Sequence, residues 1–171
     1  MKVMLLFPPN WTPTMPHLAL PTLTAFLRAN GVEVIQRDLN LEVFDEILTR
    51  RYIETSVEKL KGIFGVKADT PPSGRALPPR EKVLWAINEG QGLAKKVEGA
   101  KDILRSKRFF DGPVGKRAFE TVIEALELAS LPFYPANLNF QSYTAAAPVD
   151  SSKELLKLVK DERYNIFIDI Y

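Results

Sequence analysis

The first forty residues constrain the fold most, because two apolar stretches flank a segment with helical spacing. Lys2–Phe7 (KVMLLF) predicts a strand, and its nearly continuous apolar character is typical of a parallel strand buried on both faces. A helix is expected from Pro21, with Gly31 as its C-terminal stop. Val32–Arg37 predicts a second strand that ends at Asp38. Strand, helix and strand within forty residues are typical of a crossover unit that joins two parallel strands.

The loop between the first strand and this helix lacks the glycines with which a nucleotide-binding loop approaches a phosphate. It carries instead five prolines, a tryptophan and the only histidine of the chain. These residues are Pro8, Pro9, Pro13, Pro16, Pro21, Trp11 and His17. Such a composition raises the question of which ligand, other than a phosphate, the loop holds.

Residues 41–147 predict a large helical elaboration of this unit. Asn40 is a candidate N-terminal cap for its first helix. Two more helices are expected from Glu81 to about Arg105 and over Val114–Leu128, where apolar residues recur at helical spacing. Three glycines weaken the first of these two, each by about 1 kcal/mol relative to alanine. They are Gly90, Gly92 and Gly99.

Four further segments complete the chain. Residues 67–81 (KADTPPSGRALPPRE) predict a surface loop or linker, because they contain two Pro-Pro pairs and a glycine. Residues 131–148 (LPFYPANLNFQSYTAAAP) predict an irregular segment packed across the helices. Ser151–Glu154 (SSKE) is a capping box that opens a fifth helix. By propensity, residues 165–171 (NIFIDIY) predict a last strand.

These elements predict an α/β, helix-rich fold: an incomplete Rossmann-like (flavodoxin-like) parallel sheet with a large helical insertion. We expect one domain over residues 1–171, made of a β-α-β unit (1–40), the insertion (41–147) and a return to the sheet core (148–171). A doubly wound sheet needs four or more parallel strands, and the sequence ends inside an apolar run. We therefore favour a truncated N-terminal fragment over a small complete domain.

Composition narrows the class of protein. The 171 residues are 46% hydrophobic and 26% charged, as in a soluble globular domain. There are no cysteines, so this chain alone cannot build a disulfide, a zinc-thiolate site or an iron–sulfur cluster. No apolar stretch approaches the roughly 20 residues of a membrane span, and the apolar start is too short for a signal peptide. We expect a cytoplasmic protein without a membrane partner.

Charge is unevenly distributed along the chain. Residues 50–117 contain 16 Lys and Arg against 8 Asp and Glu, although the net charge is only +2. A basic region of this kind can face nucleic acid or an acidic protein. Acidic residues are interleaved throughout it, which favours a solvated helical surface instead. We do not expect a nucleic-acid partner.

The front of the chain resembles the N-terminal cobalamin-binding region of cobalamin-dependent radical S-adenosylmethionine enzymes. The resemblance rests on the strand KVMLLFPPN, on the pattern Pro21-x-Leu23-x-x-x-Leu27-x-x-x-Gly31, and on EVIQRD ending at Asp38. The segment DSSKELLKLVKDERYNIF near the C-terminus is also similar to that family, in which it often continues as a helix rather than a strand. The helical middle, residues 41–147, would be an elaboration specific to a subfamily.

The resemblance implies that the chain binds cobalamin (vitamin B12) at the carboxyl ends of its strands. A rigid proline-rich loop with an aromatic face suits the broad, mostly apolar corrin, and polar side chains can bond the amides at its rim. The implied binding residues are Pro8, Pro9, Asn10, Trp11, Thr12, His17 and Asp38. The parent enzyme would be a methyltransferase or carry out related radical chemistry. Its iron–sulfur cluster and S-adenosylmethionine would belong to a downstream radical domain.

Three of the implied residues have alternative roles. Trp11 either flanks the corrin or covers the following helix, and Asp38 either binds a ligand hydroxyl or prepares the turn toward Asn40. His17 is the only imidazole available to cobalt, and a structural role is its alternative. The aromatic residues of 131–148 can stack on a planar ligand or belong to the core. They include Phe133, Tyr134, Phe140 and Tyr143.

The sequence departs from the family in two ways and leaves two other functions open. It lacks the three cysteines that hold the radical cluster, and it lacks the DxHxxG motif by which some cobalamin domains supply a histidine to cobalt. The alternatives are the N-terminal half of a two-domain glycosyltransferase that uses a sugar nucleotide, and a helical interaction module. An exposed sheet edge would also allow a homodimer.

Overall fold

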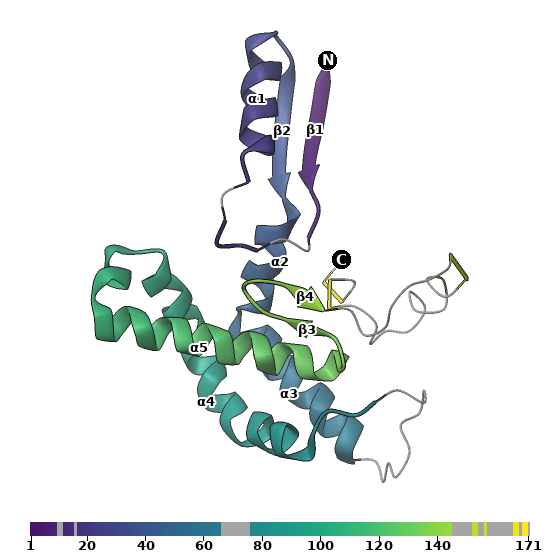
Figure 1. Ribbon diagram of the computed structural model, residues 1–171, viewed down its shortest axis with the longest axis vertical. Helices are drawn as coiled ribbons and strands as arrows, with labels where there is room; N and C mark the ends of the chain where they lie inside the picture. The colour runs from purple at the N-terminus through teal and green to yellow at the C-terminus, as the bar shows by residue number, and fades with distance from the viewer. Residues whose placement is uncertain are drawn as a thin grey trace.

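The computed structural model describes residues 1–9, 12–15, 17–65, 76–144, 152, 153, 156, 166, 167, 169 and 170. Its described part consists of a narrow β-α-β unit that stands on a body of helices (Figure 1). The two parts meet where the second strand passes into the first helix of the body. This arrangement is α/β and helix-rich, as expected.

The β-α-β unit matches the prediction closely. β1 (Lys2–Phe7) pairs in parallel with β2 (Glu33–Asp38), and α1 (Ala19–Ala29) connects them. Gly31 ends α1 with a φ of 74°, a conformation that favours glycine. The Val32 N–H donates to the Leu27 carbonyl, and the Gly31 N–H donates to the Arg28 carbonyl. These two bonds define a Schellman motif, so the predicted glycine stop is confirmed.

The prediction that β1 is buried on both faces is wrong. Exposed and half-buried residues alternate along the strand, and Met4 and Leu6 expose 54% and 51% of their surface. Ile35, which pairs with Met4 in the register, is also exposed. The reason is that α1 covers one face of the sheet, while no described element covers the other. An apolar sheet face is therefore left open to solvent.

The first helix of the body begins without a connecting loop. α2 (Leu39–Ile47) follows β2 directly, and the Asp38 carboxylate accepts the Leu41 N–H at 3.0 Å. Asp38 is therefore the cap, and the prediction that Asn40 caps this helix is wrong. Asn40 lies inside the first turn and is buried. A carboxylate at this position satisfies a free N–H and interacts favourably with the helix dipole.

Three longer helices form the body. They are α3 (Arg50–Gly65), α4 (Arg80–Leu104) and α5 (Gly112–Ser130), with the short 3₁₀ helices η1 (Lys107–Phe110) and η2 (Leu131–Phe133) at the two ends of α5. The predicted helices from Glu81 and over Val114–Leu128 are confirmed within a few residues. Of the predicted linker 67–81, residues 67–75 lie outside the described part, residues 76–79 precede α4 without regular structure, and residues 80 and 81 already belong to α4.

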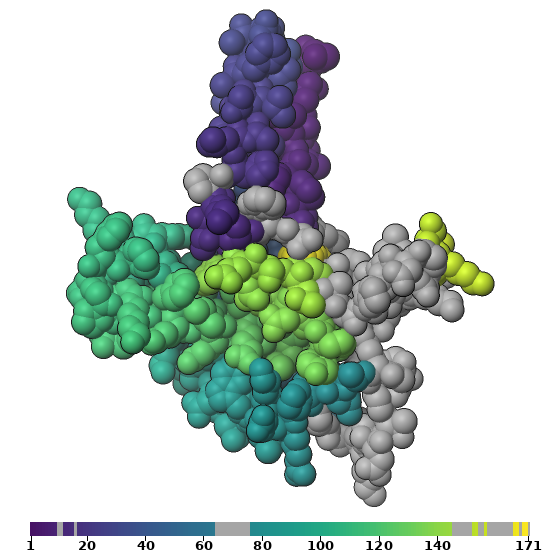
Figure 2. All heavy atoms as spheres, viewed as in Figure 1, coloured from purple at the N-terminus to yellow at the C-terminus, as the bar shows by residue number. Residues whose placement is uncertain are grey.

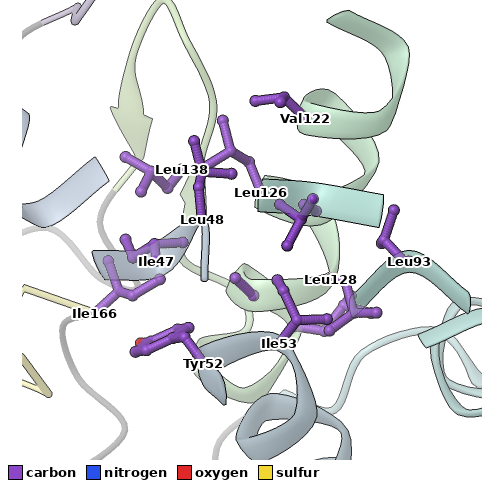
Figure 3. Close-up of a cluster of buried hydrophobic side chains, with 14 of the residues drawn as sticks. Ile47, Leu48, Tyr52, Ile53, Leu93, Val122, Leu126, Leu128, Leu138 and Ile166 are labelled. Carbon is purple, nitrogen blue, oxygen red and sulfur yellow. The ribbon is translucent and has the colours of Figure 1, made fainter. Parts of the chain in front are cut away.

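The hydrophobic core lies within this body of helices. Its buried members come from α2, from the three longer helices and from the segments that follow α5 (Figure 3). They include Ile47, Ile53, Val57, Leu60, Val97, Val122, Leu126, Leu128, Phe133 and Ile166. No residue of β1 or β2 belongs to this cluster. Burial in the helical body therefore supplies most of the hydrophobic stabilisation of the described residues.

The segment predicted as irregular contains a small hairpin. β3 (Asn137–Leu138) and β4 (Tyr143–Thr144) pair antiparallel after η2 and lie along α5 (Figure 1). The Leu138 N–H donates to the buried Ser130 hydroxyl at 2.9 Å, which fixes the hairpin to the end of α5. Ser152, Lys153 and Leu156 of the predicted fifth helix are helical, while its cap Ser151 lies outside the described residues.

The C-terminal prediction of a strand is wrong for the residues that can be described. Ile166, Phe167, Asp169 and Ile170 lie in turns, so the helical alternative is not found there either. Ile166 and Phe167 are buried in the helical core. The Tyr52 hydroxyl donates to the Asp169 carboxylate at 3.0 Å, and Lys59 forms an ion pair with the same group. Polar anchors and apolar burial therefore attach this segment to α3.

Substitution of Gly90 tests how closely the helices pack. A Cβ at this position would lie 2.4 Å from Val57 Cγ2 and 3.3 Å from Leu128 Cδ1, whereas a Cβ at Gly92 or Gly99 would meet nothing within 4 Å. We expect Gly90→Ala to lower the free energy of unfolding by about 1–2 kcal/mol, because overpacking outweighs helix propensity. Gly92→Ala should raise it by up to about 1 kcal/mol. Urea denaturation measures both, and equal effects of the two substitutions would contradict the packing.

Substitution of Tyr52 tests how the C-terminal residues are attached to α3. Burial, together with the neighbouring Asp169 carboxylate, raises the pKa of Tyr52 above its ordinary value of about 10. The folded protein thus retains a proton that the unfolded chain loses, so this stabilisation is present below about pH 10 and is lost as pH rises. At pH 8 we expect Tyr52→Phe to lower the free energy of unfolding by about 1 kcal/mol. Between pH 8 and pH 10.5 the variant should lose less stability than the unmodified protein, because it lacks the titrating hydroxyl. Urea denaturation measures the stability of both proteins at the two pH values, and the same pH dependence in both would refute this role.

Candidate functional site

The candidate site lies at the carboxyl ends of the two parallel strands. Phe7 pairs with Asp38 in the register, so β1 and β2 end together where the sheet meets the helical body. Residues 12–15 of the following loop lie at this junction (Figure 2). They close a small hollow of about 90 Å³ between the strand ends and α2. Its lining residues are Phe7, Thr12, Pro13, Met15, His17, Asp38, Asn40 and Leu41.

His17 is held in this hollow by an aromatic contact. The centroids of the Phe7 and His17 rings are 3.9 Å apart, with an angle of 37° between the ring planes. Phe7 is the last residue of β1, and His17 lies two residues before the start of α1. The two ends of the loop are therefore joined by this contact. The imidazole is positioned at the end of the sheet without being part of the core cluster.

The polar groups of the hollow come from three different segments. Thr12 and Thr14 form a hydrogen bond between their hydroxyl groups at 2.8 Å, and the Thr14 N–H also approaches Thr12 Oγ1. Asp38 lines the hollow while its carboxylate caps α2. Asn40 lines it from the first turn of α2. The hollow thus combines a hydroxyl, an imidazole and an amide, which can donate and accept hydrogen bonds, with a carboxylate, which accepts them.

The structure brings together part of the predicted set. Thr12, His17 and Asp38 all line the hollow. Pro8 and Pro9 follow β1 directly but do not line it. Asn10 and Trp11 lie outside the described residues, so their predicted roles stay predictions.

Sequence reasoning missed several lining residues. The sequence predicts a helix cap at Asn40 and a buried strand position for Phe7, and neither prediction indicates a place in the site. The available signal was their position, since both lie at or directly after the carboxyl end of a predicted strand. Pro13, Met15 and Leu41 carried no signal, because their apolar side chains gain a role only through the folding of the loop onto α2.

A second, larger hollow adjoins the first. Its volume is about 310 Å³, and Pro13 and Leu41 line both hollows. The larger hollow extends over the helical body toward α4 and α5. Most of its walls are apolar, with three charged side chains among them: Asp45, Lys101 and Arg105.

Metal binding and membrane insertion find no support in the residues described. They contain no cluster of three or more His, Cys, Asp or Glu side chains suited to a metal ion. None of the described helices has the length and apolar character needed to cross a bilayer.

Comparisons with known proteins give no relative for this chain. No family model, curated protein or solved structure matches it.

Asp38 can be tested as the residue that joins sheet, hollow and helix. We expect Asp38→Ala to lower the free energy of unfolding by about 1 kcal/mol, because the Leu41 N–H loses its acceptor. Asp38→Asn should be close to the unmodified protein, since an amide oxygen still accepts that bond. Urea denaturation of both variants measures the difference. Equal stability of the alanine and asparagine variants would show that the cap contributes nothing.

Proposed function

We propose that this chain is the cobalamin-binding N-terminal region of a cytoplasmic radical S-adenosylmethionine enzyme of the methyltransferase type. The observation that supports the proposal is the position of Thr12, His17 and Asp38 around one hollow at the carboxyl ends of parallel strands. Open α/β sheets bind their ligands at this edge. In this proposal the fold is the beginning of a Rossmann-like sheet, and the helical body is an insertion specific to the chain.

The size of the hollow decides how cobalamin would be held. Drug-sized ligands occupy pockets of about 300–1,000 Å³, and cobalamin is larger than such ligands. A hollow of about 90 Å³ therefore fits one edge of the cofactor, such as a side-chain amide of the corrin, and not the whole ring. Thr12 and Asn40 are suited to bond such an amide, because hydroxyl and amide groups both donate and accept.

The remaining contacts would come from the loop and from other parts of the parent enzyme. Bound cobalamin would supply methyl-group transfer, while this chain would bind and orient it. Pro8 and Pro9 would fix the direction of the loop, and Asn10 and Trp11 keep their predicted place beside the corrin. His17 is the only histidine of the chain and would supply any imidazole ligand to cobalt.

The uncovered sheet supports a docking role for the β-α-β unit. Met4, Leu6 and Ile35 form an apolar strip on the open face of the sheet. In the proposed enzyme, the downstream radical domain, with its cluster and S-adenosylmethionine, covers this face. An unpaired edge of this two-stranded sheet would in addition allow a homodimer when that domain is missing.

Titration with hydroxocobalamin tests the proposal. It should be followed by calorimetry and absorbance, on this chain and on one extended by about 100 residues, the size of a small domain. We expect one cobalamin per chain, and about tenfold weaker binding for His17→Ala, a factor equivalent to about 1.4 kcal/mol. A change in the corrin absorbance that is lost in His17→Ala would identify imidazole coordination.

A matched control is Thr121→Ala, which changes a half-buried residue of α5 that does not line the hollow. It should bind cobalamin as the unmodified protein does. If the extended chain is folded and does not bind cobalamin, the proposal fails. Titration with sugar nucleotides, and salt-dependent pull-down of acidic partners, would then test the glycosyltransferase and interaction-module alternatives.

A further inference from the structure

The larger hollow has the features of a separate ligand site. It lies between α2, the end of α4, η1, α5 and the β3–β4 hairpin, and its volume of about 310 Å³ falls within the range of small-molecule pockets. Its aliphatic walls are Leu41, Leu48, Leu104 and Val122. The loop residues Pro13 and Thr14 form its wall toward the sheet.

One wall of this hollow is an ordered aromatic stack. The Phe140 ring is nearly parallel to Phe119, with centroids 5.4 Å apart and 10° between the planes. It is also nearly parallel to Phe44, at 6.3 Å and 15°. Phe44 is buried in the core, whereas Phe119 is partly exposed. The stack therefore presents a preformed apolar surface that extends from the interior to solvent, which reduces the entropy lost when a ligand binds.

A charged cluster lies beside this apolar surface. Asp45 Oδ1 lies 2.7 Å from Lys101 Nζ and 3.0 Å from Arg105 Nη2. Lys101 Nζ also donates to the Asp45 carbonyl oxygen at 3.1 Å. The hydrogen bond from Lys101 holds the pKa of Asp45 below its usual range, so Asp45 is ionised at neutral pH. Two cations and one anion leave this cluster with one net positive charge.

The two cations of the cluster differ in exposure. The Lys101 side chain is only 16% exposed and makes both of its bonds to Asp45, whereas the Arg105 side chain is 60% exposed. A guanidinium carries five N–H donors and can bond two carboxylates at once. Arg105 is therefore the group of the cluster that can reach a ligand in the hollow while Lys101 holds Asp45.

We propose that this hollow binds an amphiphilic monocarboxylate, with its apolar chain on the Phe44–Phe140–Phe119 stack and its carboxylate on Arg105. A single negative charge brings the cluster to neutrality, which favours a monoanion over a neutral or cationic ligand of equal apolar size. The proposal does not rest on cobalamin binding, because the lining residues that carry it belong to the helical body.

Three ligands with the same apolar chain and different head groups test this inference. Octanoate, octan-1-ol and octylamine are titrated into the complete chain below their micellar concentrations, by calorimetry and by NMR shift perturbation. We expect saturable 1:1 binding of octanoate, about fivefold weaker binding of octanol, and the weakest binding of octylamine, since an exposed charge pair contributes at most about this factor. Shifts should concentrate on Phe119, Val122 and Phe140.

Two charge variants test the head-group contact. Arg105→Gln removes the net positive charge of the cluster and should abolish the preference for octanoate over octanol. Arg108→Gln removes the charge of an exposed arginine in η1 that does not line the hollow, and should leave the preference unchanged. If both variants weaken octanoate equally, general surface charge accounts for binding and the site is refuted.

A third variant locates the apolar chain. Leu104→Trp places a larger side chain in the wall of the hollow and should weaken all three ligands together, with circular dichroism as the check that it folds. Unchanged binding in the folded Leu104→Trp protein would place the ligand elsewhere and overturn the proposal. Absence of saturable octanoate binding to the unmodified protein would also overturn it, whatever the outcome with cobalamin.

Discussion

The passage from β2 into α2 without a loop is the constraint on which the described structure depends. Asp38 is the last residue of the strand and the cap of the helix, so one residue ends the sheet edge and starts the helical body. Because no residues intervene, the carboxyl ends of both strands must face α2. The loop after β1 then has to return to α1 between these strand ends and α2. The small hollow is a consequence of this junction.

Stability and site geometry come from different parts of the molecule. The core cluster consists of residues from the helical body and the segments that pack on it, and no residue lining the small hollow belongs to it. The sheet unit, in contrast, leaves Met4 and Leu6 half exposed. An apolar strip of this kind is typical of a surface that docks against something else. Burial in the helical body therefore stabilises the described fold, while the sheet unit leaves one face uncovered.

Much of the fold could be predicted from the sequence where a local signal acted alone. The β-α-β unit was predictable because strand propensity, helical spacing and Gly31 agree, and the Schellman bonds confirm the glycine. The predictions failed where a tertiary contact decides. Asp38 and Asn40 are both good capping residues, and only the end of β2 selects Asp38. The apolar run of residues 165–171 has strand propensity, yet Ile166 and Phe167 are buried against helices, and a strand needs a partner that this packing does not offer.

The two hollows differ in how their shape is maintained. The larger one includes Phe44, Leu48 and Val122 of the core, so its shape is fixed by the same packing that stabilises the body. The smaller one depends on the Phe7–His17 contact, the threonine pair and the capped turn at Asp38. The resemblance implied three residues of the smaller hollow, because its motifs lie at the ends of the two predicted strands. Sequence reasoning did not find the larger hollow, because Leu41, Leu104 and Phe140 converge only after α2, α4 and the hairpin have packed. A site at strand ends can therefore be located once the strands are predicted, whereas a site between helices can be located only when their packing is known.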